Sequence, residues 1–222
     1  MKVILFGATG MVGQACLLEC LDDPSVTQVL AVVRESTGRK HDKFREILLK
    51  DFADYSSIEN ELTGYDSCLF CLGITSAGRT EEAYRKVTKD IALAAAQTLL
   101  KKNPFMTFVF VSGAGADSSE KGKVMWARVK GEAENALLKM PFQDVYVVRP
   151  AFIQPMQGVV SKVKMYNYLY KLLGPLYPLL KRLFPRQTIN SRDLARVMIR
   201  LAREGAAKKV LESADFEPLI PR

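Results

Sequence analysis

Three glycines near the start of the chain have the spacing of a phosphate-binding loop. The segment Gly7-Ala-Thr-Gly10-Met-Val-Gly13 directly follows an apolar run, Lys2–Phe6, and opens a stretch with helical periodicity. In such a loop the first glycine permits a tight turn, the second lets phosphates approach the backbone, and the third lets the helix pack closely. The helix N-terminus adds unpaired N–H groups and partial positive charge. The pattern predicts a dinucleotide-binding site, with an ordinary glycine-rich turn as the alternative.

Arg34 bears on which dinucleotide binds. It follows the apolar run Val29–Val33, about twenty residues beyond the loop, where NAD-binding proteins place a carboxylate on the adenosine ribose. A guanidinium at this position can hold a 2′-phosphate through two parallel hydrogen bonds. Glu35 comes next and would accept ribose hydroxyls if the strand ended one residue later. Arg39 and Lys40 either add positive charge near this position or lie in a solvated loop. We therefore expect NADP(H) as the cofactor, with NAD(H) as the alternative.

Apolar runs alternate with helical patterns up to Pro150. Strands are expected at Lys2–Phe6, Val29–Val33, Ile47–Leu49, Cys68–Leu72, Phe105–Ser112 and Val145–Arg149, and helices at Gly10–Leu21, Glu81–Lys102 and Lys123–Lys139. Apolar strands that alternate with helices indicate a parallel sheet covered on both faces. The fold class is therefore α/β, a doubly wound Rossmann sheet over residues 1–150. Residues 151–222 are expected to form a small helical cap on the substrate side, with a helix at Asp193–Glu204 and a short strand at Val210–Leu211.

Composition limits the class of protein. The 222 residues are 48% hydrophobic, which suits one domain with a large core, 1–222. No apolar run is long enough for a membrane span, and the glycine loop comes too early for a signal peptide, so we expect a soluble cytoplasmic protein. The net charge of +8 suits an anionic ligand, an acidic membrane or nucleic acid. The basic residues are dispersed without aromatic partners, so nucleic acid is not an expected partner.

The cysteines do not have the pattern of a metal or redox site. Cys16 and Cys20 share one face of an expected helix, and Cys68 and Cys71 point to opposite faces of an expected strand. We interpret them as small core residues. The single histidine, His41, lies in a charged stretch, so no metal site is expected and a zinc enzyme or a Ser-His-Asp hydrolase has few residues to use.

Several segments together resemble a known superfamily. They are GATGMVG, AVVRES, CLGITSAG, VSGAGAD and ARVKGEAE. The chain is similar to the short-chain dehydrogenase/reductase superfamily and, within it, to the atypical NAD(P)-binding group of HTATIP2-like proteins. The resemblance covers nearly the whole chain, but the region after Pro150 matches only loosely.

The resemblance implies a role for each matching position. The pyrophosphate loop would comprise Gly7, Thr9, Gly10, Met11, Val12 and Gly13. The adenosine half would be held by Arg34 at the 2′-phosphate, by Asp51 and Phe52 at the adenine, and by Leu72, Gly73 and Ile74 behind the ribose. The nicotinamide half would be held by Lys130 at the ribose and by Arg149, Pro150, Ala151 and Phe152 beside the carboxamide. Asp51 can instead serve only a turn at a strand end, and Lys130 can be a solvated helix lysine.

The chain departs from the family pattern at the chemical centre. The family transfers a hydride between nicotinamide and a carbonyl carbon, while a tyrosine four residues before the lysine moves the proton. Position 126 holds Trp126, whose indole N–H can donate a hydrogen bond but keeps its proton near neutral pH. Ser112 occupies the expected serine position, but Gly113 stands where many members place a hydroxyl that faces the substrate. The catalytic set Ser112, Trp126 and Lys130 is therefore altered.

Three functions remain open from the sequence. The first is an NADPH-dependent reductase or isomerase of a small carbonyl substrate that uses another acid: Tyr84, Tyr166, Tyr168 or a bound water. The second is a non-catalytic NADPH sensor that binds a regulatory protein partner. The third is a protein of the membrane surface, because residues 160–184 mix lysines with tyrosines and leucines. A cap helix with its apolar face on the core has the same pattern, so only peripheral membrane contact is considered.

Overall fold

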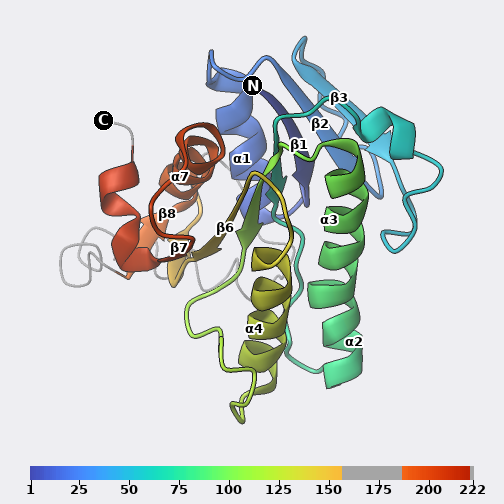
Figure 1. Cartoon of the computed structure of the whole chain (residues 1–222). Helices are drawn as coiled ribbons and strands as arrows, with labels where there is room; N and C mark the ends of the chain where they lie inside the picture. Colours follow the sequence, from blue (N-terminus) through green and yellow to red (C-terminus); the bar gives the residue numbers. More distant parts are fainter. Residues whose placement is uncertain (157–186, 221–222) are drawn as a thin grey trace.

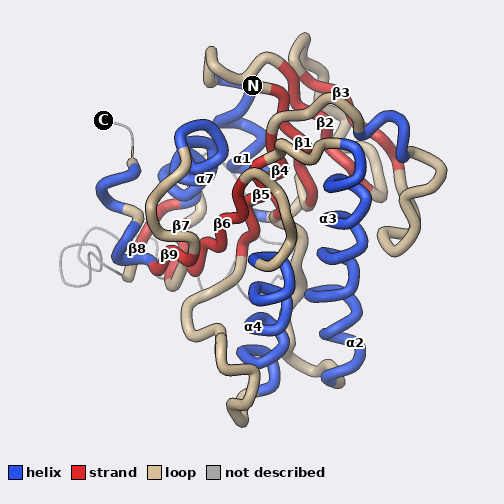
Figure 2. Tube along the Cα trace, in the orientation of Figure 1, coloured by secondary structure: helices blue, strands red, loops and turns tan. Residues whose placement is uncertain are grey.

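The computed structural model describes residues 1–156 and 187–220, and its centre is a seven-stranded parallel sheet (Figures 1 and 2). The strand order is β3-β2-β1-β4-β5-β6-β9. The strands are β1 Lys2–Phe6, β2 Gln28–Val33, β3 Phe44–Leu48, β4 Ser67–Phe70, β5 Thr107–Val111, β6 Asp144–Arg149 and β9 Val210–Glu212. Successive strands run outward in one direction from β1 to β3 and in the other from β4 onward. The expected doubly wound fold is confirmed.

Helices cover both faces of this sheet (Figure 1). On one face lie α1 Met11–Asp22 and α7 Ser191–Glu204; on the other lie α3 Ile91–Lys102 and α4 Met125–Leu138. The expected long helix over 81–102 begins as α2 Glu81–Arg85 and passes through a π-helical turn, η2 Lys86–Asp90, into α3. The 3-10 helices are η1 Glu59–Leu62, η4 Ser213–Asp215 and η5 Glu217–Leu219.

Strand residues alternate between the two helical layers. Val3 and Leu5 of β1 pack with α1 and α7, whereas Ile4 and Phe6 pack with α3 and α4, and all four are fully buried. The same alternation places Cys68 on the α3 side and Cys71 on the α1 side, as expected from their odd separation. Because both faces are buried, the strands carry apolar residues at every position, which is the pattern that predicted them.

Part of the segment expected to form a cap completes the Rossmann core instead. α7 packs against α1, and β9 extends the main sheet beyond β6. A separate two-stranded parallel sheet pairs β7 Phe152–Gln154, which follows β6, with β8 Thr188–Asn190, which precedes α7. The expected boundary at residue 150 therefore differs from the structure, because the chain returns to the sheet after β8.

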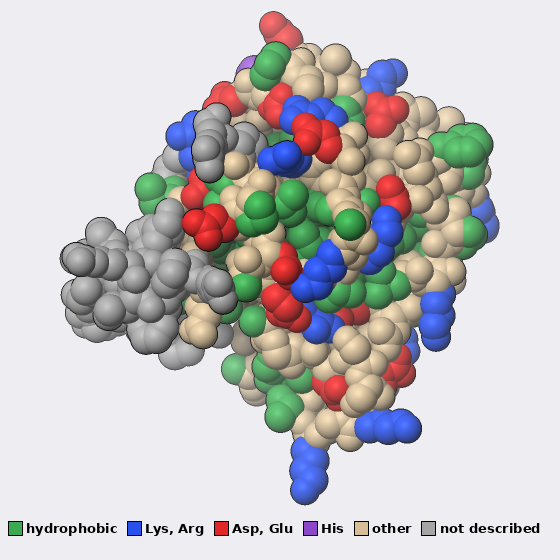
Figure 3. Space-filling model, turned by 60° about the vertical axis from the view of Figure 1, so that its left-hand side comes forward, with side chains coloured by type: hydrophobic (Ala, Val, Ile, Leu, Met, Phe, Trp, Pro, Cys, Tyr) green, Lys and Arg blue, Asp and Glu red, His purple; other side chains and the backbone are tan. Residues whose placement is uncertain are grey.

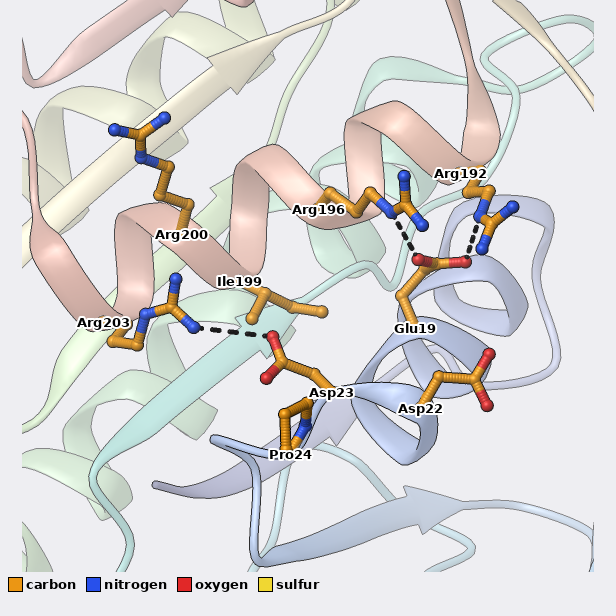
Figure 4. Close-up of a pocket in the computed structure, with 9 residues that line it drawn as sticks. All are labelled: Glu19, Asp22, Asp23, Pro24, Arg192, Arg196, Ile199, Arg200 and Arg203. Atoms are coloured by element: carbon orange, nitrogen blue, oxygen red, sulfur yellow. Dashed lines mark hydrogen bonds and ion pairs between the residues drawn. The ribbon is translucent and has the colours of Figure 1, made fainter. Parts of the chain in front are cut away.

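A buried carboxylate holds α7 to α1 (Figure 4). Glu19 is only 4% exposed and accepts hydrogen bonds from Arg192 Nε at 2.8 Å and Arg196 Nε at 2.7 Å. At the end of the same contact, Arg203 lies 3.6 Å from Asp23. A buried carboxylate is costly unless it is paired and hydrogen-bonded, so the two arginines fix the spacing of the helices. The small cavity between them, about 280 Å³, is lined mostly by charges that already have partners.

The positive net charge does not gather into one patch on the visible face. Lys and Arg side chains lie among Asp and Glu side chains in Figure 3. Within 1–156 and 187–220, no helix combines the length and apolar character that crossing a bilayer requires. The basic, tyrosine-rich segment 160–184 and the candidate acids Tyr166 and Tyr168 lie outside the described residues.

Candidate functional site

A cavity of about 620 Å³ opens at the carboxyl ends of β1, β2 and β4. In open α/β sheets, ligands bind in the crevice where the strand order reverses, which here lies between β1 and β4. Its volume is within the range of small-molecule sites. The lining residues are Gly7, Ala8, Thr9, Gly10, Val32, Val33, Arg34, Glu35, Ser36, Lys50, Phe52, Cys71, Leu72 and Gly73.

The three loop glycines differ in what requires them. Gly7 has a φ of +80°, and a Cβ on it would lie 2.7 Å from the backbone of Cys71 and Leu72. A Cβ on Gly13 would lie 2.0 Å from the Gly7 carbonyl oxygen. At Gly10, a Cβ would meet only that same oxygen, at an ordinary 3.4 Å. The fold itself therefore requires Gly7 and Gly13, while Gly10 leaves one wall of the cavity free of a side chain.

Two cations stand at the cavity rim without partners. Arg34 and Lys50 are exposed, and neither side chain has a hydrogen bond or ion pair among the residues that the structure describes. Glu35 also lines the rim. These charges would meet the adenosine end of a dinucleotide whose pyrophosphate lay on the glycine loop.

The turn after Arg34 is held by Glu46 of β3. Its carboxylate accepts hydrogen bonds from the Ser36 hydroxyl, from Thr37 N at 3.0 Å and from Thr37 Oγ1 at 2.8 Å. Burial alone would raise the pKa of Glu46, but these hydrogen bonds outweigh it and hold the pKa below its usual value. The carboxylate is therefore ionised near neutral pH and fixes the segment that presents Arg34.

The structure brings most residues expected at the pyrophosphate and the adenosine into this cavity. Those that line it are Gly7, Thr9, Gly10, Arg34, Phe52, Leu72 and Gly73. Those expected but absent from the lining are Met11, Val12, Gly13, Asp51 and Ile74. Asp51 accepts a hydrogen bond from Ala53 N at 2.9 Å, which is the turn role considered as its alternative. Sequence reasoning missed Ser36, Lys50 and Cys71, although each lies just beyond a strand end, where such sites form.

Lys130 and Trp126 lie one helical turn apart on α4, beside the loop that follows β5. The Lys130 Cε is 3.8 Å from where a Cβ on Gly113 would be, and the Trp126 ring is 3.3 Å from a Cβ built on Gly115. Lys130 has no hydrogen-bond partner in the described part of the chain. Burial lowers the pKa of Lys130 to about 8, and the negative charge of Glu134 opposes this only partly.

Ser112 and Arg149 share a buried carboxylate and do not line the cavity. Glu134 is fully buried and accepts hydrogen bonds from the Ser112 hydroxyl and from Arg149 Nε at 3.1 Å. Arg149 also donates to Glu212 at 2.9 Å and to the Ser118 hydroxyl at 2.6 Å. The hydrogen bonds that Arg149 donates to Glu134 raise the pKa of Arg149 despite its burial, so the guanidinium stays charged. Both side chains are thus held by Glu134 in the described structure, and their expected contacts with nicotinamide and substrate stay predictions.

The remaining candidates are bound within the fold. The Pro150 carbonyl accepts from Ala114 N at 3.0 Å, Ala151 N donates to Ser213 Oγ at 2.7 Å, and Phe152 belongs to β7. Tyr84 is only 2% exposed, and burial raises its pKa. Because a raised pKa weakens a phenol as a proton donor, Tyr84 is a poor replacement for the missing tyrosine.

Comparisons with known proteins agree with this site. Residues 7–204 match the family model described as NAD(P)H-binding. The chain is 29% identical over 159 residues to protein fmp52, mitochondrial, of Emericella nidulans, in a match spanning 68% of this chain and 66% of that protein. It is 26% identical over 154 residues to protein HTATIP2 of Rattus norvegicus, spanning 68% of this chain and 62% of that protein. These matches therefore cover less than two thirds of either relative.

Solved structures share the fold at low sequence identity. An oxidoreductase of the short-chain dehydrogenase/reductase family from Burkholderia thailandensis has a TM-score of 0.69 at 14% identity, covering 96% of this chain and 90% of that one. The Bordetella bronchiseptica enzyme WbmF, solved with NAD+, has a TM-score of 0.67 at 15% identity, covering 98% and 76%.

The relatives also correct one expectation from the sequence. We expected a cytoplasmic protein, but the Fmp52 relatives from several fungi are named mitochondrial, so that expectation is wrong. The expectation rested on apolar runs in the sequence, and these do not distinguish compartments. The matched family model, the parallel sheet and the relatives agree on the family: the chain belongs to the NAD(P)H-binding family and is an atypical short-chain dehydrogenase/reductase of the HTATIP2-like group.

Proposed function

We propose that this protein binds NADP(H) in preference to NAD(H) and reduces a small carbonyl substrate. The observation that carries the proposal is the cavity between β1 and β4. There Gly10 leaves room for phosphates, and two cations at the rim have no partner among residues 1–156 and 187–220. The names of the Fmp52 relatives support mitochondria as its place of action.

The preference for NADP(H) rests on charge at the rim. Arg34 and Lys50 each lack a partner among the described residues and are free to meet a 2′-phosphate. Glu35 opposes them, since a carboxylate suits the ribose hydroxyls of NAD(H) and repels a phosphate. Two cations against one anion favour the phosphorylated cofactor, and a guanidinium adds geometric fit through its two parallel N–H donors.

The proposed proton donor is Lys130. Bound NADPH supplies a hydride to a carbonyl carbon, and the oxygen must then receive a proton. Trp126 cannot provide it, because an indole does not ionise near neutral pH. The Lys130 ammonium is half-buried, unpaired among the described residues, and has a pKa of about 8. A donor whose pKa lies near the working pH is efficient in general acid catalysis.

A non-catalytic sensor is the second candidate function. It is favoured by the loss of both family hydroxyls: Trp126 replaces the tyrosine, and the Ser112 hydroxyl is bound to Glu134. A protein of this kind would bind NADPH without turnover and signal through a protein partner. Turnover of NADPH with a panel of aldehydes and quinones separates the two functions.

Replacing Gly10 by valine should abolish cofactor binding while the fold survives. The added side chain meets only one protein atom within 4 Å of its Cβ, the Gly7 oxygen, but occupies the space through which phosphates would approach. Fluorescence titration with NADPH measures binding, and thermal unfolding measures stability. Gly13→Ala is the control for loss of the fold. Its Cβ would clash with the Gly7 backbone, so this variant should unfold at a lower temperature, whereas Gly10→Val should not. Binding of NADPH by Gly10→Val at parental strength would place the phosphate site elsewhere.

Arg34→Glu should reverse the cofactor preference. A charge-assisted contact of this kind is worth roughly 1.5 to 3 kcal/mol, or about ten- to a hundred-fold in affinity. We expect the parent to bind NADPH more tightly than NADH by that factor and the variant to prefer NADH. Arg39→Glu changes the same charge at an exposed position outside the cavity lining and should leave the preference nearly unchanged. Equal affinities of the parent for both cofactors, measured by calorimetry, would contradict the assignment.

The rate of carbonyl reduction should fall as pH rises through about 8. Below the pKa of Lys130 its ammonium can give a proton; above it the neutral amine cannot, so the reduction rate drops roughly tenfold per pH unit. Oxidation of the product alcohol needs the amine as a base and should rise through the same pH. Lys130→Met should remove both dependences along with most of the turnover. A flat profile for the parent between pH 7 and pH 9 would exclude Lys130 as the donor.

Trp126→Tyr should raise turnover. Tyrosine places an ionisable hydroxyl one turn before Lys130, and positioned acid–base groups contribute about 10²- to 10⁴-fold. The gain should be larger with Gly113→Ser, since a Cβ there meets only Lys130 Cε, at 3.8 Å. NADPH consumption by the parent and both variants measures the effect, with Trp126→Phe as the control for loss of the indole. Fast parental turnover that neither Trp126→Tyr nor Trp126→Phe changes would show that position 126 lies outside the reaction.

A further inference from the structure

Two cysteines from different elements meet directly beneath the cavity. Cys16 lies on α1 and Cys71 follows the last residue of β4, and their sulfur atoms are 3.8 Å apart. Cys71 is half-buried and lines the cavity, whereas Cys16 is fully buried with its sulfur 3.8 Å from that of Met198. Both are free thiols. Fifty-five positions separate them along the chain, so their contact exists only in the folded protein.

We propose that Cys16 and Cys71 form a reversible disulfide, with a peroxide as the oxidant, and that this modification controls the cofactor site. The Cys71 thiolate attacks one peroxide oxygen, the O–O bond breaks, and Cys71 becomes a sulfenic acid. The Cys16 sulfur, losing its proton, then attacks the Cys71 sulfur, so that an S–S bond forms and the S–O bond breaks. The two thiols lose two electrons in total, and hydrogen peroxide leaves as two molecules of water.

The surroundings of the two thiols set the order of these steps. Cys71 faces the cavity and is the sulfur that a dissolved oxidant reaches first. Contact with Cys71 and burial raise the pKa of Cys16, so Cys16 remains a protonated thiol until its neighbour is oxidised. A buried thiol in contact with a sulfenic acid is protected from other partners and needs no diffusion to resolve it.

The other two cysteines are poorly placed for this reaction. Cys68 is fully buried on the opposite face of the sheet, among the residues that pack with α3. Cys20 lies one turn beyond Cys16 and is also fully buried, away from the cavity lining. The C-x-x-C spacing of Cys68 and Cys71 is therefore misleading, and the reactive pair joins a helix to a strand end.

Closing the disulfide must move a wall of the cavity. The sulfurs have to approach from 3.8 Å to about 2 Å. The Cys71 backbone cannot move toward Gly7, because the two backbones are already closely packed. The residues after Cys71, Leu72 and Gly73, form part of the cavity wall. Cys16 lies on the helix that begins at the glycine loop. We therefore expect the oxidised protein to bind NADPH at least tenfold more weakly, a step that rests on the proposed function.

The test uses the full chain with hydrogen peroxide, with and without NADPH. Trypsin leaves Cys16 on the peptide 3–34 and Cys71 on the peptide 51–79, so mass spectrometry under non-reducing conditions detects the link. The double variant Cys20→Ser, Cys68→Ser retains only the reactive pair and should still form it. Cys71→Ser should not form it, and Cys16→Ser should stop at the sulfenic acid. Dithiothreitol should remove the link and restore NADPH affinity.

Four results decide the proposal. A link between the two peptides of the double variant, formed more slowly with NADPH present, supports both the disulfide and its coupling to the site. Thiols that stay free, or a Cys68–Cys71 link within peptide 51–79 of the parent, would overturn the disulfide. A link that forms without changing the affinity for NADPH would overturn the coupling. If the reduced protein binds no NADPH but the link still forms, the proposed function fails and the disulfide stands.

Discussion

The close packing of Gly7 between α1 and the end of β4 is the constraint on which the site depends. Its backbone leaves no room for a side chain on itself, facing Cys71 and Leu72, or on Gly13, which faces its carbonyl oxygen. The first turn of α1 is therefore held at a fixed height above the sheet. That turn offers unpaired N–H groups to an anion, and its position places them beside the rim cations Arg34 and Lys50.

The two halves of the site have changed to different degrees from the family pattern. Around the proposed adenosine half, the cavity is lined by the glycine loop and by Arg34, whose side chain has no partner in the described part of the chain, and Glu46 holds the adjoining turn. Around the reacting half, Trp126 fills the tyrosine position and the Ser112 hydroxyl is bound to Glu134. Lys130 remains as the group with a free proton near neutral pH. The proposed reductase and the proposed sensor share this cofactor half and differ at the chemical half, so a measurement of turnover distinguishes them.

Local patterns predicted most of the fold, and contacts distant in sequence account for what they missed. The alternation of apolar strands and helices predicted the sheet up to β6. The glycine spacing predicted a phosphate-binding loop, and two of its glycines, Gly7 and Gly10, line the cavity. The pairing of Glu19 with the arginines of α7 joins residues more than 170 positions apart, so no local pattern predicted that α7 belongs to the core. The contact of Cys16 with Cys71 was missed for the same reason. The hydrogen bond from the Ser112 hydroxyl to Glu134 was also missed, because Glu134 looks like any helix glutamate in the sequence.

The central claim is that a dinucleotide lies at the carboxyl edge of the sheet, over the glycine loop and beside Arg34. Amide hydrogen exchange of the full chain, measured by mass spectrometry with and without NADPH, tests it directly. NADPH should slow exchange in three separate segments: residues 7–13, 34–36 and 71–73. Protection confined to the cavity between α1 and α7, around Asp22 and Arg192, or no protection at saturating NADPH, would contradict it.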